Sequence, residues 1–275
     1  MRSSRLLSRA ALGLVLAVYT IYQLGPFVWV AAMSLRTTNE ILRDHYALPA
    51  SPRWSNYVDA WSTSNYHVYF WNSAIVVTAS VALLVVVGTT AAHCLARYRF
   101  PGNRLILIVI FSTILLPPQI TLISLFQVLV EYGLFDSRLG LTLVYVGTQV
   151  PLTVYLLEAF FARIPQDLFD AAKIDGYSEF EIFWRIALPI ATPAVVTAVI
   201  VNFVLLWNEF LYAVVLISDD ARRTLPLGIQ KFMGDQFSDV AMIAAGAMIS
   251  IVPVILLYAL FSEKVIQGMT AGAVK

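Results

Sequence analysis

Residues 170–189 read DAAKIDGYSEFEIFWRIALP, a polar and amphipathic insert between two long apolar runs. Pro165, shortly before it, is expected to end the preceding helix. Asp167 is then placed to cap a short helix over about 168–174, because a side-chain oxygen there can bond free backbone N–H groups. Gly176 is expected to end this helix, since glycine is the residue that best adopts a positive φ.

A second helix is predicted within the same insert. Ser178 and Glu181 form an S-x-x-E capping box, which is typical of a helix N-terminus. This helix is expected to run to Leu188 and to close at Pro189. The insert should therefore hold two short helices at an angle.

The first of these helices is expected to expose a patch of small residues that lets another surface come close. The patch consists of Leu168, Ala171, Ala172 and Asp175. The surrounding segment 162–190 is acidic: it holds Asp167, Asp170, Asp175, Glu179 and Glu181 against Arg163, Lys173 and Arg185. A negative surplus favours a protein partner over lipid headgroups, so we interpret the insert as a docking surface. The alternative is an amphipathic re-entry segment without a partner.

The whole chain is suited to a lipid environment. Of its 275 residues, 59% are hydrophobic and 13% are charged, and the mean hydropathy is +0.77. Six apolar stretches approach or exceed the roughly 20 residues that span a bilayer. They cover about residues 10–34, 71–95, 105–130, 139–161, 191–217 and 241–262. The sequence therefore predicts an all-α membrane protein with six transmembrane helices in a single domain over 1–275.

Positive charge favours a cytoplasmic position for both termini. Three arginines lie in 1–9, and three more lie in the short segment 96–104. Basic loops are retained in the cytoplasm, and an even number of spans puts both ends on one side. The insert 162–190 would then be cytoplasmic too. The segments 35–70 and 218–240 would lie outside.

The sequence lacks the residues that several classes of function require. One cysteine, Cys94, cannot form an internal disulfide, and the three histidines are scattered, so we expect no metal site. The chain has no P-loop, and therefore ATP is not expected to bind to it. No H-E-x-x-H or G-x-S-x-G motif is present, so no catalytic residues are assigned. A formal charge of +1 does not indicate a nucleic-acid partner.

The insert is similar to the EAA loop of ABC-importer permease subunits. The pattern is DAA-x3-G with a closing Leu-Pro, and Asp170 stands where glutamate is usual. Other segments resemble the carbohydrate-uptake branch of this family and its maltose-permease-like second subunit. They are PRWSNYVDAW (52–61), LARYRFPGNR (95–104), LLPPQITLISLF (115–126), WNEFLYAVVL (207–216), RTLPLGIQ (223–230) and QGMTAGAVK (267–275).

The resemblance implies a multi-pass permease in the bacterial cytoplasmic (inner) membrane that imports a sugar or sugar-like solute. It implies a homologous second permease, a pair of ATPase subunits that bind ATP and Mg, and an extracytoplasmic solute-binding protein as partners. Residues 167–176 would form a coupling helix in a cleft of an ATPase subunit. The residues assigned to ATPase coupling are Asp170, Ala171, Ala172, Asp175, Gly176, Arg185, Leu188 and Pro189.

Two further segments take roles from the resemblance alone. The loop 222–239 is expected to contact the solute-binding protein, with Gln230, Asp235 and Gln236 at its tips. A solvated turn is an equally good interpretation of this loop. The tail 268–275 is expected to reach toward the ATPase pair.

The fifth apolar stretch carries the main candidates for the solute pathway. Asn202 and Glu209 are seven residues apart and are expected to share a helix face, with Trp207 and Asn208 beside Glu209. Polar groups inside a membrane are costly and point inward, and a sugar needs hydrogen bonds together with an aromatic surface. The alternative for Glu209 is a pairing with a cation or with backbone of the partner permease.

Two weaker pathway candidates lie elsewhere. Asn72 begins the second apolar stretch and is also suited to a helix cap. Gln119 follows Pro117 and Pro118, which are expected to break the third stretch and to shape the cavity.

A different class of function is a secondary transporter or channel that works alone on a small polar solute. Such a protein would be expected to show inverted repeats with broken helices, or a chain of membrane-buried carboxylates. Neither is visible in the sequence.

Overall fold

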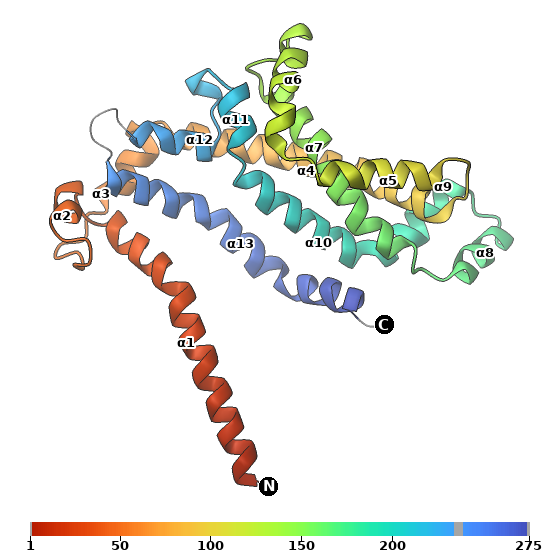
Figure 1. The fold of residues 1–275 in the computed structure, drawn as a ribbon, viewed down its shortest axis with the longest axis horizontal. Helices are drawn as coiled ribbons and strands as arrows, with labels where there is room; N and C mark the ends of the chain where they lie inside the picture. The colour runs from red at the N-terminus through yellow and green to blue at the C-terminus, as the bar shows by residue number, and fades with distance from the viewer. Residues whose placement is uncertain (1, 234–238, 274–275) are drawn as a thin grey trace. The chain divides into compact units, whose positions relative to one another are not determined.

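The computed structural model describes residues 2–233 and 239–273, and within these ranges the regular secondary structure is helical (Figure 1). The chain forms two compact units. One consists of Met1–His67 with Gly228–Val252, and the other consists of Val68–Leu227 with Pro253–Lys275. Two long helices, α4 (Tyr66–Arg97) and α13 (Val240–Ala273), run from one unit into the other.

The first unit holds α1 (Arg2–Ser34) and a small folded cap made of short helices. The cap contains α2 (Thr38–Arg43), α3 (Ser55–Val58) and a π-helical turn η1 (Asp59–Thr63). Asn56 donates hydrogen bonds of 2.8 Å to the carbonyls of Ser34 and Arg36, which fixes the end of α1 to α3. The aromatic segment 35–70 is therefore structured by buried polar contacts as well as by its rings.

The second unit contains the remaining helices. They are α5 (Asn103–Ile114), α6 (Pro118–Glu131), α7 (Arg138–Phe161), α8 (Gln166–Ile174), α9 (Glu179–Ile182), the π-helical turn η2 (Phe183–Ala187), α10 (Leu188–Trp207), α11 (Leu211–Leu216) and the 3-10 turn η3 (Asp220–Arg222). The short helix α12 (Leu225–Ile229) begins in the second unit and ends in the first, and the 3-10 turn η4 (Gln230–Phe232) belongs to the first unit.

Among the described residues, five helices are long and apolar enough to cross a membrane, and α5 with α6 makes a sixth if this pair counts as one span. The pair is bent by 100°, which is much more than the expected kink. Pro117 and Pro118 cause the break because neither has a backbone N–H, and Pro117 is extended with ψ 134°. The third apolar stretch is thus two helices at nearly a right angle.

The fifth apolar stretch also differs from the prediction at both ends. Pro189 does not close a helix: α9, η2 and α10 run continuously from Glu179 to Trp207. In the π-helical turn the Leu188 N–H bonds the carbonyl of Phe183, five residues back, and this wider turn leads into the proline. The helix then ends at Trp207, ten residues before the predicted boundary at 217, and α11 follows after a short break.

The core of the second unit joins α4, α7 and α10. A Cβ atom added to Gly88 of α4 would lie 2.5 Å from Cγ2 of Thr153, so only glycine allows α4 and α7 to approach this closely. The amide of Asn202, on α10, donates to Oγ1 of Thr153 at 2.9 Å. Three helices therefore meet at one tightly packed point.

Candidate functional site

The helix α8 is built from the signals in the insert, with one correction at its start. Pro165 occupies the N-cap position and no side chain caps the helix, so the predicted capping by Asp167 is wrong. Asp167 instead lies in the first turn, where a carboxylate interacts favourably with the helix dipole. Gly176 ends the segment with φ +84°, and the capping box of Ser178 and Glu181 is present, which confirms both predictions.

The inner face of α8 packs into the second unit. Phe169 and Ala172 are 4% and 3% exposed. The prediction that Ala172 belongs to an exposed patch is therefore wrong, because it lies one turn from Phe169 on the buried side of the helix. Leu168, Ala171 and Asp175 are exposed, as expected, and Ile174 is exposed beside them.

Arg97, at the end of α4, holds the first turn of α8. Its guanidinium lies 3.7 Å from the centroid of the Phe169 ring and donates to the carbonyl of Ile164 and to Oε1 of Gln166, each at 3.0 Å. Gln166 in turn donates to Asp170 at 2.9 Å. Asp170 is exposed and helps to fix the helix start rather than capping it.

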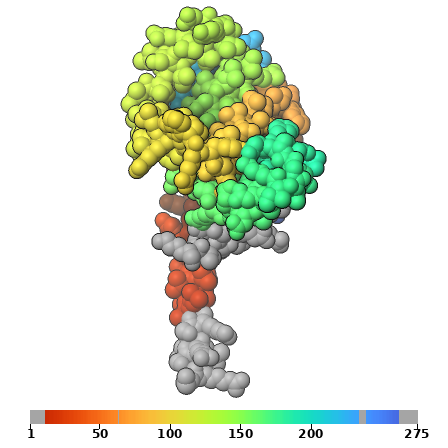
Figure 2. Space-filling view, turned by 90° about the vertical axis from the view of Figure 1, so that its right-hand side faces the viewer, coloured from red at the N-terminus to blue at the C-terminus, as the bar shows by residue number. Residues whose placement is uncertain are grey.

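A second set of polar contacts holds the far end of α8. The Tyr98 hydroxyl donates to Glu179 at 2.7 Å, and Glu179 forms an ion pair with Lys173 at 2.7 Å. Burial and the neighbouring Glu179 carboxylate raise the pKa of Tyr98 well above its ordinary value, so the phenol stays protonated and able to donate. Figure 2 shows the segment of α8 and α9, in teal, beside the amber residues at the end of α4.

His93 fills the space beneath α8. It is 4% exposed, and its ring centroid lies 5.1 Å from that of Phe183, 5.3 Å from that of Phe161 and 6.1 Å from that of Phe169. The ring of His93 thus packs among aromatic side chains, whereas Cys94 beside it is exposed. The roles of Arg97, Tyr98 and His93 toward α8 were missed, since nothing local links residues 93–98 to an insert about 70 positions later.

The remaining coupling candidates lie on the segment after Gly176. Arg185 is exposed, pairs with Glu181 at 3.4 Å and lies 5.5 Å from the Tyr177 ring centroid. Leu188 is partly buried and Pro189 is exposed, both in the first turn of α10.

The structure separates the predicted pathway residues. Asn202 is 1% exposed and donates to Thr153 and to the carbonyl of Ala198, at 2.8 Å. Glu209 lies beyond the end of α10, so the predicted common helix face for these two residues is wrong. Trp207 is 3% exposed and stacks on Phe203, with ring centroids 5.4 Å apart. A fourth candidate, Asn208, is exposed, and its amide donates to the carbonyl of Val204 at 2.8 Å.

Glu209 is held within the chain by three donors. Its carboxylate accepts from the Tyr145 hydroxyl at 2.7 Å, from the Tyr212 N–H at 2.8 Å and from the Ala213 N–H at 3.2 Å. The side chain therefore caps the start of α11 and ties it to α7. Neither of the two roles predicted for Glu209 included this one.

Of the two weaker pathway candidates, Asn72 is buried and Gln119 is exposed. Asn72 is 2% exposed, and its amide donates to the carbonyls of Ala221 and Arg223, both at 2.9 Å. It lies inside α4 and so does not cap the helix. Gln119 is exposed on α6. Gln230 is exposed at the start of η4, while Asp235 and Gln236 lie outside the described residues.

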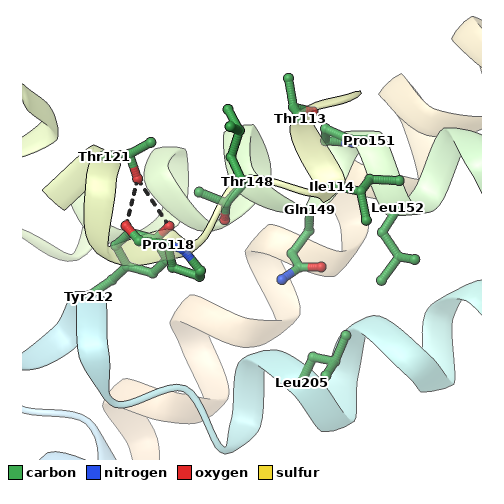
Figure 3. Close-up of a pocket in the computed structure, with 12 residues that line it drawn as sticks. Thr113, Ile114, Pro118, Thr121, Thr148, Gln149, Pro151, Leu152, Leu205 and Tyr212 are labelled. Atoms are coloured by element: carbon green, nitrogen blue, oxygen red, sulfur yellow. Dashed lines mark hydrogen bonds between the residues drawn. The ribbon is translucent and has the colours of Figure 1, made fainter. Parts of the chain in front are cut away.

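An open groove lies next to the break between α5 and α6. It has a volume of about 430 Å³ and receives side chains from α5, α6, α7, α10 and α11 (Figure 3). Its lining is formed by Thr113, Ile114, Leu116, Pro118, Thr121, Gly147, Thr148, Gln149, Pro151, Leu152, Leu205 and Tyr212. None of the predicted pathway residues lines it, although Gln119 and Glu209 are close to lining residues in the sequence.

Comparison with known proteins places these features in a family. The family model described as "Binding-protein-dependent transport system inner membrane component" matches residues 84–267. The chain is 34% identical to the diacetylchitobiose uptake system permease protein NgcG of Streptomyces coelicolor, over 94% of this chain and 86% of that protein. It is 36% identical to the trehalose transport system permease protein SugB of Mycobacterium tuberculosis, over 92% of this chain and 93% of that protein.

A solved structure supports the fold. A chain of a bacterial ABC transporter involved in the import of the acidic polysaccharide alginate superposes with a TM-score of 0.81 at 20% identity, over 96% of this chain and 98% of that one. This likeness confirms the all-α permease architecture. The chain therefore belongs to the family of binding-protein-dependent transport system inner membrane components, as a multi-pass ABC-importer permease subunit of the cytoplasmic membrane.

Proposed function

We propose that this permease forms half of the translocation pathway for a sugar or sugar-like solute and that the exposed face of α8 docks on an ATPase subunit. The sugar class is supported by relatives whose names include diacetylchitobiose, trehalose and melibiose/raffinose/stachyose. ATP and Mg bind to the ATPase subunits in this proposal. The chain itself supplies the pathway and the connection to these subunits.

One observation carries the docking role. The two faces of α8 have opposite environments: Phe169 and Ala172 are buried, whereas Leu168, Ala171 and Ile174 are exposed. Arg97 and the Lys173–Glu179 ion pair fix the inner face to the rest of the second unit. A short helix that is fixed on one side and apolar on the other can transmit a displacement of a partner to the membrane helices.

The other partners follow from the same proposal. A homologous second permease completes the pathway, and an extracytoplasmic solute-binding protein delivers the solute. A second solved structure is that of a bacterial alginate ABC transporter in complex with an alginate pentasaccharide-bound periplasmic protein, which supports a partner of this type. The segment around Gln230 is the proposed contact with it. Within the second unit, Asn72 fixes the carbonyls of Ala221 and Arg223.

Cysteine cross-linking tests the docking surface. In a Cys94→Ser background, Ala171→Cys should form a cross-link with the ATPase subunit of the assembled importer. Ala172→Cys is the matched control, because Ala172 is itself only 3% exposed. Equal cross-linking from both positions, or none from Ala171→Cys in a complex that imports solute, would count against docking through this face.

A further inference from the structure

Two residues of the groove beside the α5–α6 break have backbone carbonyls without their usual helical hydrogen bond. In each case the residue four positions later is a proline, which has no N–H to donate. The carbonyl of Ile114 would normally bond the N–H of residue 118, and that of Gly147 would bond the N–H of residue 151, but both of these positions are proline. Ile114 and Gly147 both line the groove. A Cβ at Gly147 would meet no atom within 4 Å, so this stretch of backbone faces open space.

Such carbonyls are tolerated at membrane depth only where they meet protein groups or line a water-filled cavity. Interrupted helices are also where transporters commonly place their solute sites, because the freed backbone groups are available to a ligand. The helix break at Pro118 and the missing helical hydrogen bond at Pro151, which lies inside the continuous α7, both occur at the same groove. This convergence favours a hydrated binding surface over a packing defect.

The polar side chains of the groove are suited to hydroxyl groups. Thr121 and Thr148 donate to carbonyls of their own helices, which leaves their oxygens as acceptors. The Tyr212 hydroxyl lies 3.4 Å from Oγ1 of Thr121. Among the residues that the structure describes, the Gln149 side-chain amide has no hydrogen-bond partner, and Figure 3 shows it extending from α7 toward Leu205. An amide offers two donors and one acceptor, which matches neighbouring sugar hydroxyls.

Charge distinguishes this surface from a site for ionic solutes. None of the residues that line the groove is Asp, Glu, Lys, Arg or His. Apolar side chains such as Leu116, Leu152 and Leu205 make up much of the remainder. A charged ligand would lose hydration here without gaining a counter-charge, whereas a neutral sugar presents both hydroxyls and apolar C–H faces.

Glu209 acts on this groove through another residue. Its carboxylate accepts from the backbone N–H of Tyr212 and from the hydroxyl of Tyr145, so it sets the position at which α11 starts. Tyr212 is the residue of α11 that reaches the groove. Glu209 is thus a positioning residue for the Tyr212 side chain.

We propose that the groove between α5, α6, α7 and α11 binds the transported solute and selects an uncharged polyhydroxylated molecule, with Gln149 and Tyr212 as its principal contacts. This inference rests on the proposed function and deepens it. It assigns the solute contacts to residues outside the fifth apolar stretch and adds a preference for neutral solutes.

The test uses the complete importer in proteoliposomes, with its second permease, ATPase pair and binding protein. Labelled trehalose and raffinose serve as neutral probes, and sulfoquinovosyl glycerol serves as an anionic probe. We expect import of a neutral probe only. Gln149→Leu and Tyr212→Phe should each lower its uptake rate about fivefold, the usual effect of losing one hydrogen bond.

Matched controls come from the same helices. Gln127→Leu on α6 and Tyr155→Phe on α7 alter exposed residues that do not line the groove, and uptake should remain at the wild-type rate. Copurification with the ATPase subunits shows that each variant assembles. Tyr212→Phe removes a single oxygen atom, so it decides the result if Gln149→Leu fails to assemble.

Each other outcome has a definite meaning. Wild-type rates of neutral uptake in both groove variants would overturn the groove assignment and leave the proposed function standing. Import of the anionic probe alone would overturn the preference for neutral solutes, again without affecting the proposed function. If the wild-type importer takes up no saccharide, the proposed function fails and this inference fails with it.

Discussion

At the scale of single residues, Arg97 joins α4 to α8 by a ring contact with Phe169 and by two hydrogen bonds. We expect Arg97→Leu to weaken this junction by about 2 kcal/mol, because a partly exposed guanidinium loses two charge-assisted bonds. Solute imported per ATP hydrolysed should fall, and amide exchange in residues 166–174 should rise. Arg99→Leu is the control, since Arg99 is exposed in the same segment. If Arg97→Leu imports as much solute per ATP hydrolysed as the wild type, the contact between α4 and α8 does not transmit the movement of α8.

Glu209 provides a second prediction at this scale. Replacement by glutamine puts an N–H₂ group where one carboxylate oxygen now accepts hydrogen bonds, so at least one of the three donors loses its acceptor. We expect Glu209→Gln to lower uptake several-fold and to leave the complex assembled, which uptake assays and copurification would measure. If the Glu209→Gln variant folds normally but no longer copurifies with the other subunits, Glu209 instead contacts the second permease.

At the scale of elements, the turn between α8 and α9 depends on backbone conformation. Gly176 has φ +84°, and a Cβ added there would meet no atom within 4 Å, so any effect of substitution is conformational. A β-branched residue in this conformation costs on the order of 1–2 kcal/mol, whereas asparagine tolerates it. Gly176→Val should therefore uncouple ATP hydrolysis from uptake, and Gly176→Asn should retain most of the coupling. Full coupled uptake in Gly176→Val would contradict a role for this turn.

The elements also show which features can be read from local sequence. The capping box at Ser178 and the positive φ at Gly176 are properties of a few adjacent residues, and both were predicted. Pro189 was misread as a helix end because the π-helical turn before it changes the hydrogen-bond register. Asn72 and Arg97 bond groups far away in the chain, and a single sequence carries no signal for such pairings.

At the scale of the whole molecule, the family and the helical architecture could be predicted, whereas the groove could not. Gln149 and Thr148 are ordinary residues in an apolar stretch. The break at Pro117 and Pro118 precedes α6, the break after Trp207 precedes α11, and both of these helices contribute residues to the groove beside them. The main pathway candidates were chosen for polar groups and an aromatic ring within the fifth stretch, with Asn72 and Gln119 added from two other stretches. Two of them, Asn202 and Glu209, bond other parts of the chain instead.

The orientation of the chain in the membrane is a prediction for the whole molecule. The basic segment 96–104 favours a cytoplasmic location for both termini and for α8. A phosphatase reporter, which is active only outside the cytoplasm, should be inactive when fused after Lys275 and active when inserted near Ala221. The opposite pattern would reverse the topology and remove α8 from the reach of an ATPase.

The contact between Gly88 and Thr153 has a consequence for how this permease changes conformation. Because Gly88 leaves no space for a side chain against Thr153, and Asn202 bonds that same threonine, α4, α7 and α10 cannot slide past one another without losing the contact. α6 and α11 lie outside this contact, after the helix breaks at residues 115–117 and 208–210, and both helices contribute residues to the groove. We therefore expect conformational changes in this subunit to move α6 and α11 relative to the block formed by α4, α7 and α10.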